Sequence, residues 1–386
     1  MAPGYPSEET KPWHLVKART EGLSNPHQQY WYQTVGYVLS EFLLGAEYSR
    51  QSQVTILHQF ANLVAPHLGV APLSGLPCWK SFMTDNHTPV ELSWDFHTGS
   101  CQPMIRYSIE PIELDAGTAT NPHNDGASAA FRQAAIKAFP ETDTTWFDHF
   151  QICFGQGWTD DRPEGHRSTI FWAFDLKESA ITNKAYFFPG TVAHATHRPT
   201  LDVVLNAIHS APRCSPETLT SIEAFANYAN QCPNLGLEMD MLAVDLVDIN
   251  KSRLKVYFRD RRTDFGTVKK TLSLGGQMQD GEFDMGVQRL KRLWDALFDT
   301  QDLSDDVPLP RRDHRTAGIL YNVEFKMHTS TPKVKVYIPV RHYAKSDAQI
   351  LSALTGFLTD EVGGQSDLHA APVYATHFAE CLQNTL

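Results

Sequence analysis

Hydrophobic side chains along this chain change their spacing in a regular order. Between residues 27 and 66 they recur every three or four positions, which predicts helices. The stretches 89–96 and 103–112 alternate between apolar and polar residues, with turn-forming residues between them, which predicts a β-hairpin. Helical spacing then returns at 127–139 and 142–150. This part of the chain is therefore expected to form helices, a hairpin and further helices.

The same order of helices and hairpin is repeated along the rest of the sequence. Strand pairs are predicted at 168–177 with 182–188, 239–248 with 251–259, and 317–327 with 332–340. Helical spacing is found at 199–209, 216–230, 282–299, 345–359 and 373–385. Hairpins form antiparallel strands, and the helices that connect them can cover only one face of the sheet. We therefore predict an α+β fold, an antiparallel β-barrel of repeated α-β-β-α units surrounded by a ring of helices.

The predicted domain organisation is simple. Residues 1–26 are polar and rich in Pro, Gly and Glu, and we expect them to form an N-terminal arm. Residues 27–386 contain all four predicted hairpins. Closed barrels often exceed the usual length of one domain. We therefore predict a single barrel domain over residues 27–386.

Composition and charge narrow the classes of function. The chain has 386 residues, of which 42% are hydrophobic and 20% charged, as is typical of a globular protein. A formal net charge of −11 disfavours nucleic acid and anionic membranes as partners, because phosphate contacts need clustered Lys and Arg. The six cysteines form no C-x-x-C pair, and neither a signal peptide nor a membrane-spanning apolar stretch is visible. We therefore expect a cytoplasmic protein whose phosphate sites, if any, are local and enclosed.

Three predicted strands contain the pattern Lys-x-Tyr within an apolar run. The segments are "NKAYFF" at 183–188, "RLKVYF" at 253–258 and "KVKVYI" at 333–338. The second strands of the four hairpins carry basic residues in corresponding positions, at Arg106, Lys184, Lys255 and Lys335. These residues are 78, 71 and 80 positions apart. The spacing indicates a repeated structural unit that is too long for the common solenoid families.

Residues two positions apart point to the same face of a strand. Each lysine therefore shares a face with the following tyrosine, while apolar neighbours such as Ala185 and Leu254 point toward helices. One interpretation is a solvated strand face. The other is a barrel interior in which basic residues bind a polyanion and aromatic faces stabilise a cation. The residues of this second interpretation are Arg106, Lys184, Arg253, Lys255 and Lys335, with Tyr186, Tyr257 and Tyr337.

Glu91 lies on an alternating strand between Val90 and Leu92, whose apolar side chains would face helices. Its carboxylate would then point into the barrel. There it could pair with a basic residue, or accept a hydrogen bond from an N–H or O–H group of an acceptor molecule. Metal-binding patterns are weak, because "DDRPE" and "SDDV" lie in polar, loop-like stretches and "HATH" has no third ligand nearby. We therefore predict no metal and no other cofactor.

Several longer stretches together resemble the fungal aromatic prenyltransferases of the dimethylallyltryptophan synthase type. They are "WKSFMTDNHTPVELSWDF", "IRYSIEPI", "WFDHF", "KAYFFPG", "SRLKVYFRD", "RTAGILYNVEF" and "KVYIPVRHYAKSD", and the resemblance runs from about residue 30 to 380. Each stretch is weak alone, but together they are specific. The resemblance implies the ABBA-type barrel that the periodicity also predicts. It further implies transfer of a dimethylallyl group from its diphosphate to an indole, without a metal.

The resemblance also implies roles for individual residues. Glu91 matches the glutamate that hydrogen-bonds the indole nitrogen. The matches to the diphosphate ligands are Arg106, Lys184, Arg253 and Lys255, and those to the tyrosines that shield the allyl cation are Tyr186, Tyr257 and Tyr337. Lys335 stands where some members carry glutamine, and we expect it to reach the diphosphate as well. The predicted catalytic residues are Glu91 and Lys184.

Two features depart from the family pattern. Members that act on free tryptophan carry a basic residue on the first strand of the third hairpin, where this chain reads "LEMDMLAVD". This acidic strand favours an acceptor without a carboxylate, such as an indole diketopiperazine. The family also continues with a fifth hairpin that carries further tyrosines, whereas this sequence stops at "YATHFAECLQNTL". A homodimer that covers the resulting gap is therefore left open.

Together these observations predict a metal-independent aromatic prenyltransferase of secondary metabolism. Its substrates would be dimethylallyl diphosphate and an indole derived from tryptophan. Two alternatives are left open by the sequence. One is prenylation of a non-indole aromatic molecule, and the other is a truncated, inactive binding protein.

Overall fold

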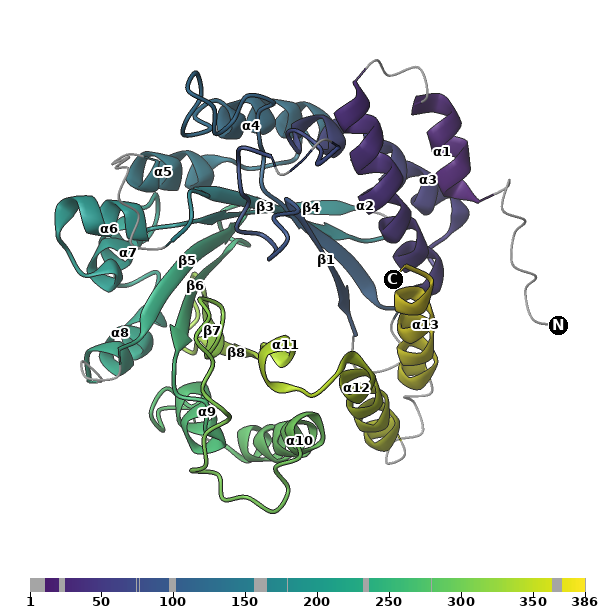
Figure 1. Ribbon diagram of the computed structural model, residues 1–386. Helices are drawn as coiled ribbons and strands as arrows, with labels where there is room; N and C mark the ends of the chain where they lie inside the picture. Colours follow the sequence, from purple (N-terminus) through teal and green to yellow (C-terminus); the bar gives the residue numbers. More distant parts are fainter. Residues whose placement is uncertain are drawn as a thin grey trace. The chain divides into compact units, whose positions relative to one another are not determined.

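Figure 1 shows the computed structural model, which describes residues 11–20, 25–73, 75, 77–96, 102–155, 165–178, 180–231, 236–278, 280–362 and 370–385. Within these residues the strands are β1 (Val90–Asp95), β2 (Met104–Ile109), β3 (Ile170–Leu176), β4 (Ile181–Phe187), β5 (Glu238–Asp245), β6 (Arg253–Asp260), β7 (Ile319–Lys326) and β8 (Lys333–Tyr337). Strand order in the sheet follows chain order from β1 to β8. The four predicted hairpins are confirmed, with strand ends close to the predicted ones.

Helices stand before, between and after the hairpins, as the spacing predicted. They are α1 (Pro12–Thr20), α2 (Pro26–Gly45), α3 (Arg50–Gln59), α4 (Ala127–Ala138), α5 (Thr145–Phe154), α6 (Gly190–Thr196), α7 (Thr200–His209), α8 (Ile222–Gln231), α9 (Phe265–Leu272), α10 (Gly281–Phe298), α11 (Val340–Tyr343), α12 (Asp347–Val362) and α13 (Ala370–Thr385). The sequence pattern did not predict α1, α6, α9 or α11. Of these, α6 and α11 have 7 and 4 residues, which is too short for a helical period to be recognised.

Local sequence explains where the longer helices begin. The side chain of Asn25 accepts hydrogen bonds from the backbone N–H groups of His27 and Gln28, and Pro26 occupies the first turn of α2. Asp280 accepts a hydrogen bond from the backbone N–H of Phe283 at the start of α10, at 2.7 Å. These caps satisfy backbone donors that have no partner inside a helix.

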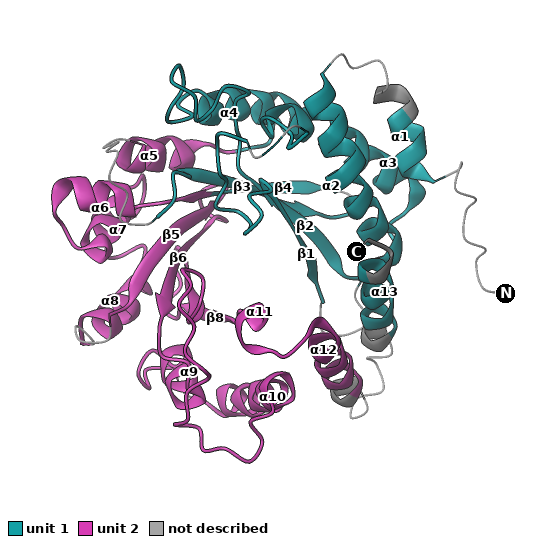
Figure 2. Cartoon of the chain, viewed as in Figure 1, with its two compact units in different colours: residues 1–142, 160–185, 367–386 teal, residues 143–159, 186–366 magenta. Residues whose placement is uncertain are grey.

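Contacts within the chain group it into two compact units (Figure 2). Unit 1 consists of residues 1–142, 160–185 and 367–386, and unit 2 consists of residues 143–159 and 186–366. Unit 1 contains the antiparallel pairs β1–β2 and β2–β3. Unit 2 contains the antiparallel pairs β5–β6, β6–β7 and β7–β8.

In each unit one face of the sheet packs against helices through aromatic rings. Phe131 of α4 contacts Trp172 of β3 in unit 1, with ring centroids 5.3 Å apart. Phe225 of α8 contacts Phe258 of β6 and Phe325 of β7 in unit 2, at 5.5 and 6.0 Å. All five side chains are fully buried. The hydrophobic core therefore occupies the helix-facing side, and the charged strand residues belong to the other side.

Two findings concern the expected cellular environment. No helix in the part of the chain that the structure describes combines the length and the apolar character needed to cross a membrane. Cys78, Cys153 and Cys214 do not take part in disulfides. Cys101 and Cys232 lie outside the described residues.

Candidate active site

In unit 1 the predicted basic residues are held by carboxylates. Arg106 of β2 lies directly across from Asp175 of β3, and its Nε is 2.8 Å from Asp175 Oδ1. Its Nη2 is 2.7 Å from Asp95 Oδ2 on β1. Lys184 of β4 donates from Nζ to both carboxylate oxygens of Asp175, at 2.6 Å each. The charges therefore alternate in the order Asp95, Arg106, Asp175, Lys184.

Unit 2 repeats this arrangement on β5, β6 and β7. Lys255 Nζ donates to Asp245 Oδ1 at 2.9 Å, and Arg253 Nε donates to the other oxygen of the same carboxylate. Arg253 Nη1 also donates to Glu324 Oε2 at 3.2 Å. Burial alone would raise the pKa of Asp245, but Lys255 and Arg253 outweigh it and hold the pKa below its ordinary value. Asp245 is therefore a carboxylate at neutral pH.

The carboxylates of these two networks were missed by the sequence analysis. The sequence does contain a pattern that predicts them. In each of three hairpins the first strand carries an acidic residue and the second strand carries a basic one. The pairs are Asp95 with Arg106, Asp175 with Lys184, and Asp245 with Lys255. Buried cations need such partners, since an uncompensated charge in the protein interior is strongly unfavourable. Lys184 and Lys255 are only 7% and 6% exposed.

Lys335 differs from the other predicted basic residues. It lies on β8 opposite Asn322 of β7 and is exposed. Among the described residues it forms no ion pair. Its ammonium group is therefore available to a ligand without displacement of a carboxylate.

The three predicted tyrosines form a row in unit 2. The ring centroids of Tyr186 and Tyr257 are 5.8 Å apart, as are those of Tyr257 and Tyr337. The Tyr257 and Tyr337 hydroxyl oxygens are 3.4 Å apart, and Asn322 Nδ2 donates to the Tyr337 hydroxyl at 2.8 Å. Burial raises the pKa of Tyr257, so its hydroxyl is neutral. The row offers adjacent aromatic faces, which attract a cation through their quadrupole.

Glu91 lies on β1 opposite Ser108 of β2, and its side chain is exposed. Within the described residues its carboxylate forms neither an ion pair nor a hydrogen bond. The predicted alternative, a pair with one of the basic residues, is therefore not seen in unit 1. Burial raises the pKa of Glu91 even though solvent reaches its side chain. A raised pKa and an exposed side chain are compatible when water reaches the carboxylate but protein atoms surround it on most sides.

Another buried carboxylate, that of Glu110, organises the segment that precedes β1. Glu110 accepts hydrogen bonds from Trp79 Nε1 at 2.9 Å, Ser81 Oγ at 2.5 Å and Ser168 Oγ at 2.8 Å. Burial raises the pKa of Glu110 to about 7, although these hydrogen bonds lower it. No pattern in the sequence pointed to this residue. It ties the segment before Glu91 to β2 and to the residues that lead into β3.

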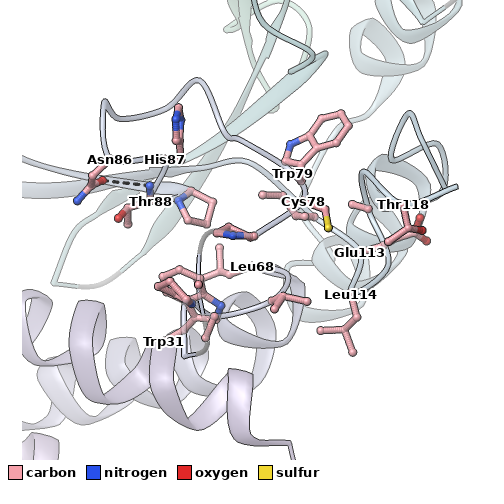
Figure 3. Close-up of a pocket in the computed structure, with 18 residues that line it drawn as sticks. Trp31, Leu68, Cys78, Trp79, Asn86, His87, Thr88, Glu113, Leu114 and Thr118 are labelled. Carbon is pink, nitrogen blue, oxygen red and sulfur yellow. Dashed lines mark hydrogen bonds between the residues drawn. The ribbon is translucent and has the colours of Figure 1, made fainter.

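Unit 1 also contains a cavity of about 180 Å³, separate from the charged network (Figure 3). Its wall includes Trp31 of α2, Trp79 and Leu114. Neither Glu91 nor Arg106 lines it. The cavity is therefore not part of the candidate active site.

Comparisons with known proteins show which family the chain belongs to. The family model for tryptophan dimethylallyltransferase matches residues 27–367. A 4-O-dimethylallyl-L-tyrosine synthase of Claviceps purpurea is 35% identical over 343 residues, which cover 86% of this chain and 76% of that protein. A 7-dimethylallyltryptophan synthase of Aspergillus fumigatus is 34% identical over 348 residues, which cover 85% of this chain and 73% of that protein.

Solved structures show the same fold. The crystal structure of AnaPT from Neosartorya fischeri is 26% identical with a TM-score of 0.78, covering 95% of this chain and 88% of that one. The structure of NotF in complex with brevianamide F and DMSPP is 22% identical with a TM-score of 0.79, covering 96% and 89%.

These likenesses confirm the predicted fold class, the ABBA-type prenyltransferase fold of repeated α-β-β-α units. The protein is an aromatic prenyltransferase. More specifically, the chain belongs to the tryptophan dimethylallyltransferase family, as the sequence resemblance predicted. The roles of the individual site residues stay predictions.

Proposed function

We propose that this enzyme transfers a dimethylallyl group from dimethylallyl diphosphate to an indole derived from tryptophan, without a metal ion. The observation that carries the proposal is the row Tyr186, Tyr257 and Tyr337 in unit 2. Lys255 precedes Tyr257 and Lys335 precedes Tyr337 by two positions, so cation and ring share a strand face. This pattern suits a substrate that separates into a polyanion and an allylic cation.

The reaction would begin with cleavage of the C–O bond between the allyl group and the diphosphate. The electron pair leaves with the diphosphate, whose growing charge is stabilised by Arg and Lys N–H donors. The allylic cation that remains is stabilised by the tyrosine faces. A ring carbon of the acceptor then supplies the electron pair of the new C–C bond, and the ring proton passes to a base.

Glu91 has the properties of the acceptor-binding group in this proposal. Its carboxylate has no partner among the described residues, and a carboxylate is an acceptor for an indole N–H. A hydrogen bond from N–H to an ionised carboxylate is stronger than one between neutral groups. It would increase electron density on the ring and so favour attack on the cation.

Two classes of acceptor are candidates, an indole without a carboxylate group and a free aromatic amino acid. Asp240 lies on β5, the acidic strand whose charge disfavours binding of an acceptor that carries a carboxylate. It accepts a hydrogen bond from Arg259 Nη2 at 3.1 Å. Arg315 Nη2 is 3.9 Å from its other carboxylate oxygen. The negative charge on this strand is therefore compensated. This compensation, together with the amino-acid names of two relatives, makes a free aromatic amino acid the second candidate acceptor.

An acceptor panel separates these candidates. The enzyme is incubated with dimethylallyl diphosphate and one of three acceptors: a tryptophan-containing diketopiperazine, L-tryptophan or L-tyrosine. We expect the highest kcat/KM with the diketopiperazine and a C-prenylated indole by NMR. A higher kcat/KM with either free amino acid would favour the second candidate, and an O-prenylated tyrosine would exclude an indole preference.

Two further properties belong to this proposal. We expect the enzyme in the cytoplasm, a reducing compartment in which Cys78, Cys153 and Cys214 would stay outside disulfides. We also expect a homodimer, because β1 and β8 are the end strands of the sheet order and end strands invite pairing with another chain. Light scattering measures the mass.

A further inference from the structure

The carboxylates of the two charge networks raise a question that the proposed reaction leaves open. A site meant for a diphosphate would bind it more tightly if its cations had no carboxylate partners. Yet Asp175 and Asp245 are themselves buried, at 6% and 8% exposure, and each contacts two of the basic residues. Their negative charge works against diphosphate binding, so their presence needs another explanation.

The geometry of the two networks supplies that explanation. In each unit one aspartate lies on the first strand of a hairpin and accepts a hydrogen bond from the lysine of the second strand. The same aspartate also receives an arginine: Arg106 from the preceding hairpin in unit 1, and Arg253 from the same strand as Lys255 in unit 2. Two cations are thereby fixed at one carboxylate. A lysine has three N–H donors and an arginine five, so the carboxylate uses only part of their donor capacity.

We propose that Asp175 and Asp245 are positioning residues for prenyl transfer, each of which holds a lysine and an arginine in the orientation that the leaving diphosphate requires. This inference rests on the proposed function. Preorganised donors stabilise charge that develops during the reaction without the cost of reorganising at that moment. Without the aspartate, two like charges would repel each other and the lysine would take several conformations. The enzyme would then bind diphosphate more tightly but transfer the allyl group more slowly.

This opposite effect on binding and turnover distinguishes positioning from a structural role. A residue that only supports the fold would, when replaced, weaken diphosphate binding and turnover together. Asp245→Asn and Asp175→Asn are suitable variants, because asparagine has the same shape but no charge. Asp302→Asn is the matched control, since Asp302 is exposed and forms no hydrogen bond or ion pair within the described residues.

The experiment combines calorimetry with inorganic diphosphate and steady-state kinetics with dimethylallyl diphosphate and the best acceptor. For Asp245→Asn and Asp175→Asn we expect the Kd of inorganic diphosphate to fall at least about threefold, because one opposing charge is removed. We expect kcat to fall at least about tenfold, the lower range for losing preorganised contacts. Asp302→Asn should change neither value.

Asp245→Glu provides a second test that does not depend on the fold tolerating asparagine. It restores the charge, so Kd should return to the wild-type value while kcat recovers in part. Parallel losses of binding and turnover in the asparagine variants, or no change in either, would overturn the proposal. Failure of the wild-type enzyme to transfer the allyl group would instead refute the proposed function, while the diphosphate titration would still report on the aspartates.

Discussion

Individual residues show how an acidic chain can bury several cations. Lys184 and Lys255 are almost inaccessible, and each donates to an aspartate that is equally buried. The desolvation cost of each ion is several kcal/mol, and it is offset only when charges are paired with good geometry. The repeat of basic residues in the sequence is therefore accompanied by a repeat of acidic ones, which keeps each network close to neutral.

Replacement of the lysines tests their role in the reaction. We expect Lys184→Ala and Lys255→Ala each to lower turnover by roughly 10², the scale of one lost electrostatic contact in an active site. The fold should persist, because Asp175 keeps Arg106 and Asp245 keeps Arg253 as partner. Steady-state kinetics and thermal unfolding measure the two effects. Lys251→Ala, at an exposed turn, is the control, and near-normal turnover of both variants would argue against a diphosphate site here.

Glu91 is expected to act on the acceptor and not on the diphosphate. Glu91→Gln should reduce transfer to indoles and leave the binding of an allyl diphosphate analogue nearly unchanged in a calorimetric titration. Burial raises the pKa of Glu91, so the wild-type carboxylate is lost as pH falls through a value above that of an ordinary glutamate. The acidic limb of kcat/KM should therefore be displaced upward, and it should be absent in the variant. Equal losses in analogue binding and turnover would assign Glu91 to the diphosphate site.

Glu110 makes stability depend on pH. Burial raises its pKa from 4.5 to about 7, so the folded state favours the protonated form. The contribution of Glu110 to the free energy of unfolding is fully present below pH 4.5. It falls by about 3 kcal/mol in all as pH rises through 7. Glu110→Gln cannot ionise. We therefore expect the wild type to lose stability relative to this variant between pH 4.5 and about 7 in urea titrations, and a constant difference would refute the assignment.

At the level of helices and strands, the sequence pattern predicted the hairpins better than it predicted the short helices or the ion pairs between strands. Alternating residues such as those around Lys255 and Tyr257 fix which face of a strand is apolar, and four hairpins follow from that pattern. Short helices such as α6 and α11 have too few residues for a period to be visible. The pairing of Arg253 with Glu324 depends on the register of β6 and β7, which no local pattern fixes.

The resemblance to known prenyltransferases supplied what periodicity alone could not. Alternation placed Glu91 on a strand and left open a hydrogen bond to an acceptor molecule, but only the resemblance identified the bonded group as an indole N–H. Glu110 was missed by both, because its partners Trp79, Ser81 and Ser168 come from separate segments. Such a cluster exists only once the chain has folded.

The start of α2 provides a test at this level. Asn25 accepts hydrogen bonds from two backbone N–H groups, and loss of such a cap costs about 1 kcal/mol. We expect Asn25→Ala to lower the free energy of unfolding, measured in urea, by about 1 kcal/mol. Asn25→Ser should keep most of the stabilisation that the cap provides, because serine can also accept these hydrogen bonds. An unchanged midpoint for Asn25→Ala would mean that α2 begins elsewhere. Turnover should be the same in both variants, since the cap touches none of the candidate site residues.

For the molecule as a whole, the division of charge matters more than its total. The net charge of −11 disfavours a general affinity for polyanions, while basic residues of the candidate site lie on strands of both units. Within the described residues no group of three or more His, Cys, Asp or Glu side chains is arranged as a metal site. The carboxylates of the two networks use only part of the N–H donors of their arginine and lysine partners, and the other donors can meet the charge of the leaving group.

The central claim is that these protein cations and tyrosines suffice for allyl transfer to an aromatic ring. The most direct measurement is the reaction of the metal-free enzyme, in excess EDTA, with dimethylallyl diphosphate and a tryptophan-containing diketopiperazine, followed by mass spectrometry and NMR of the product. We predict a C-prenylated indole at a rate that added Mg²⁺ changes only modestly. A rate that is abolished by EDTA and restored by Mg²⁺, or release of dimethylallyl alcohol without prenylated product, would contradict it.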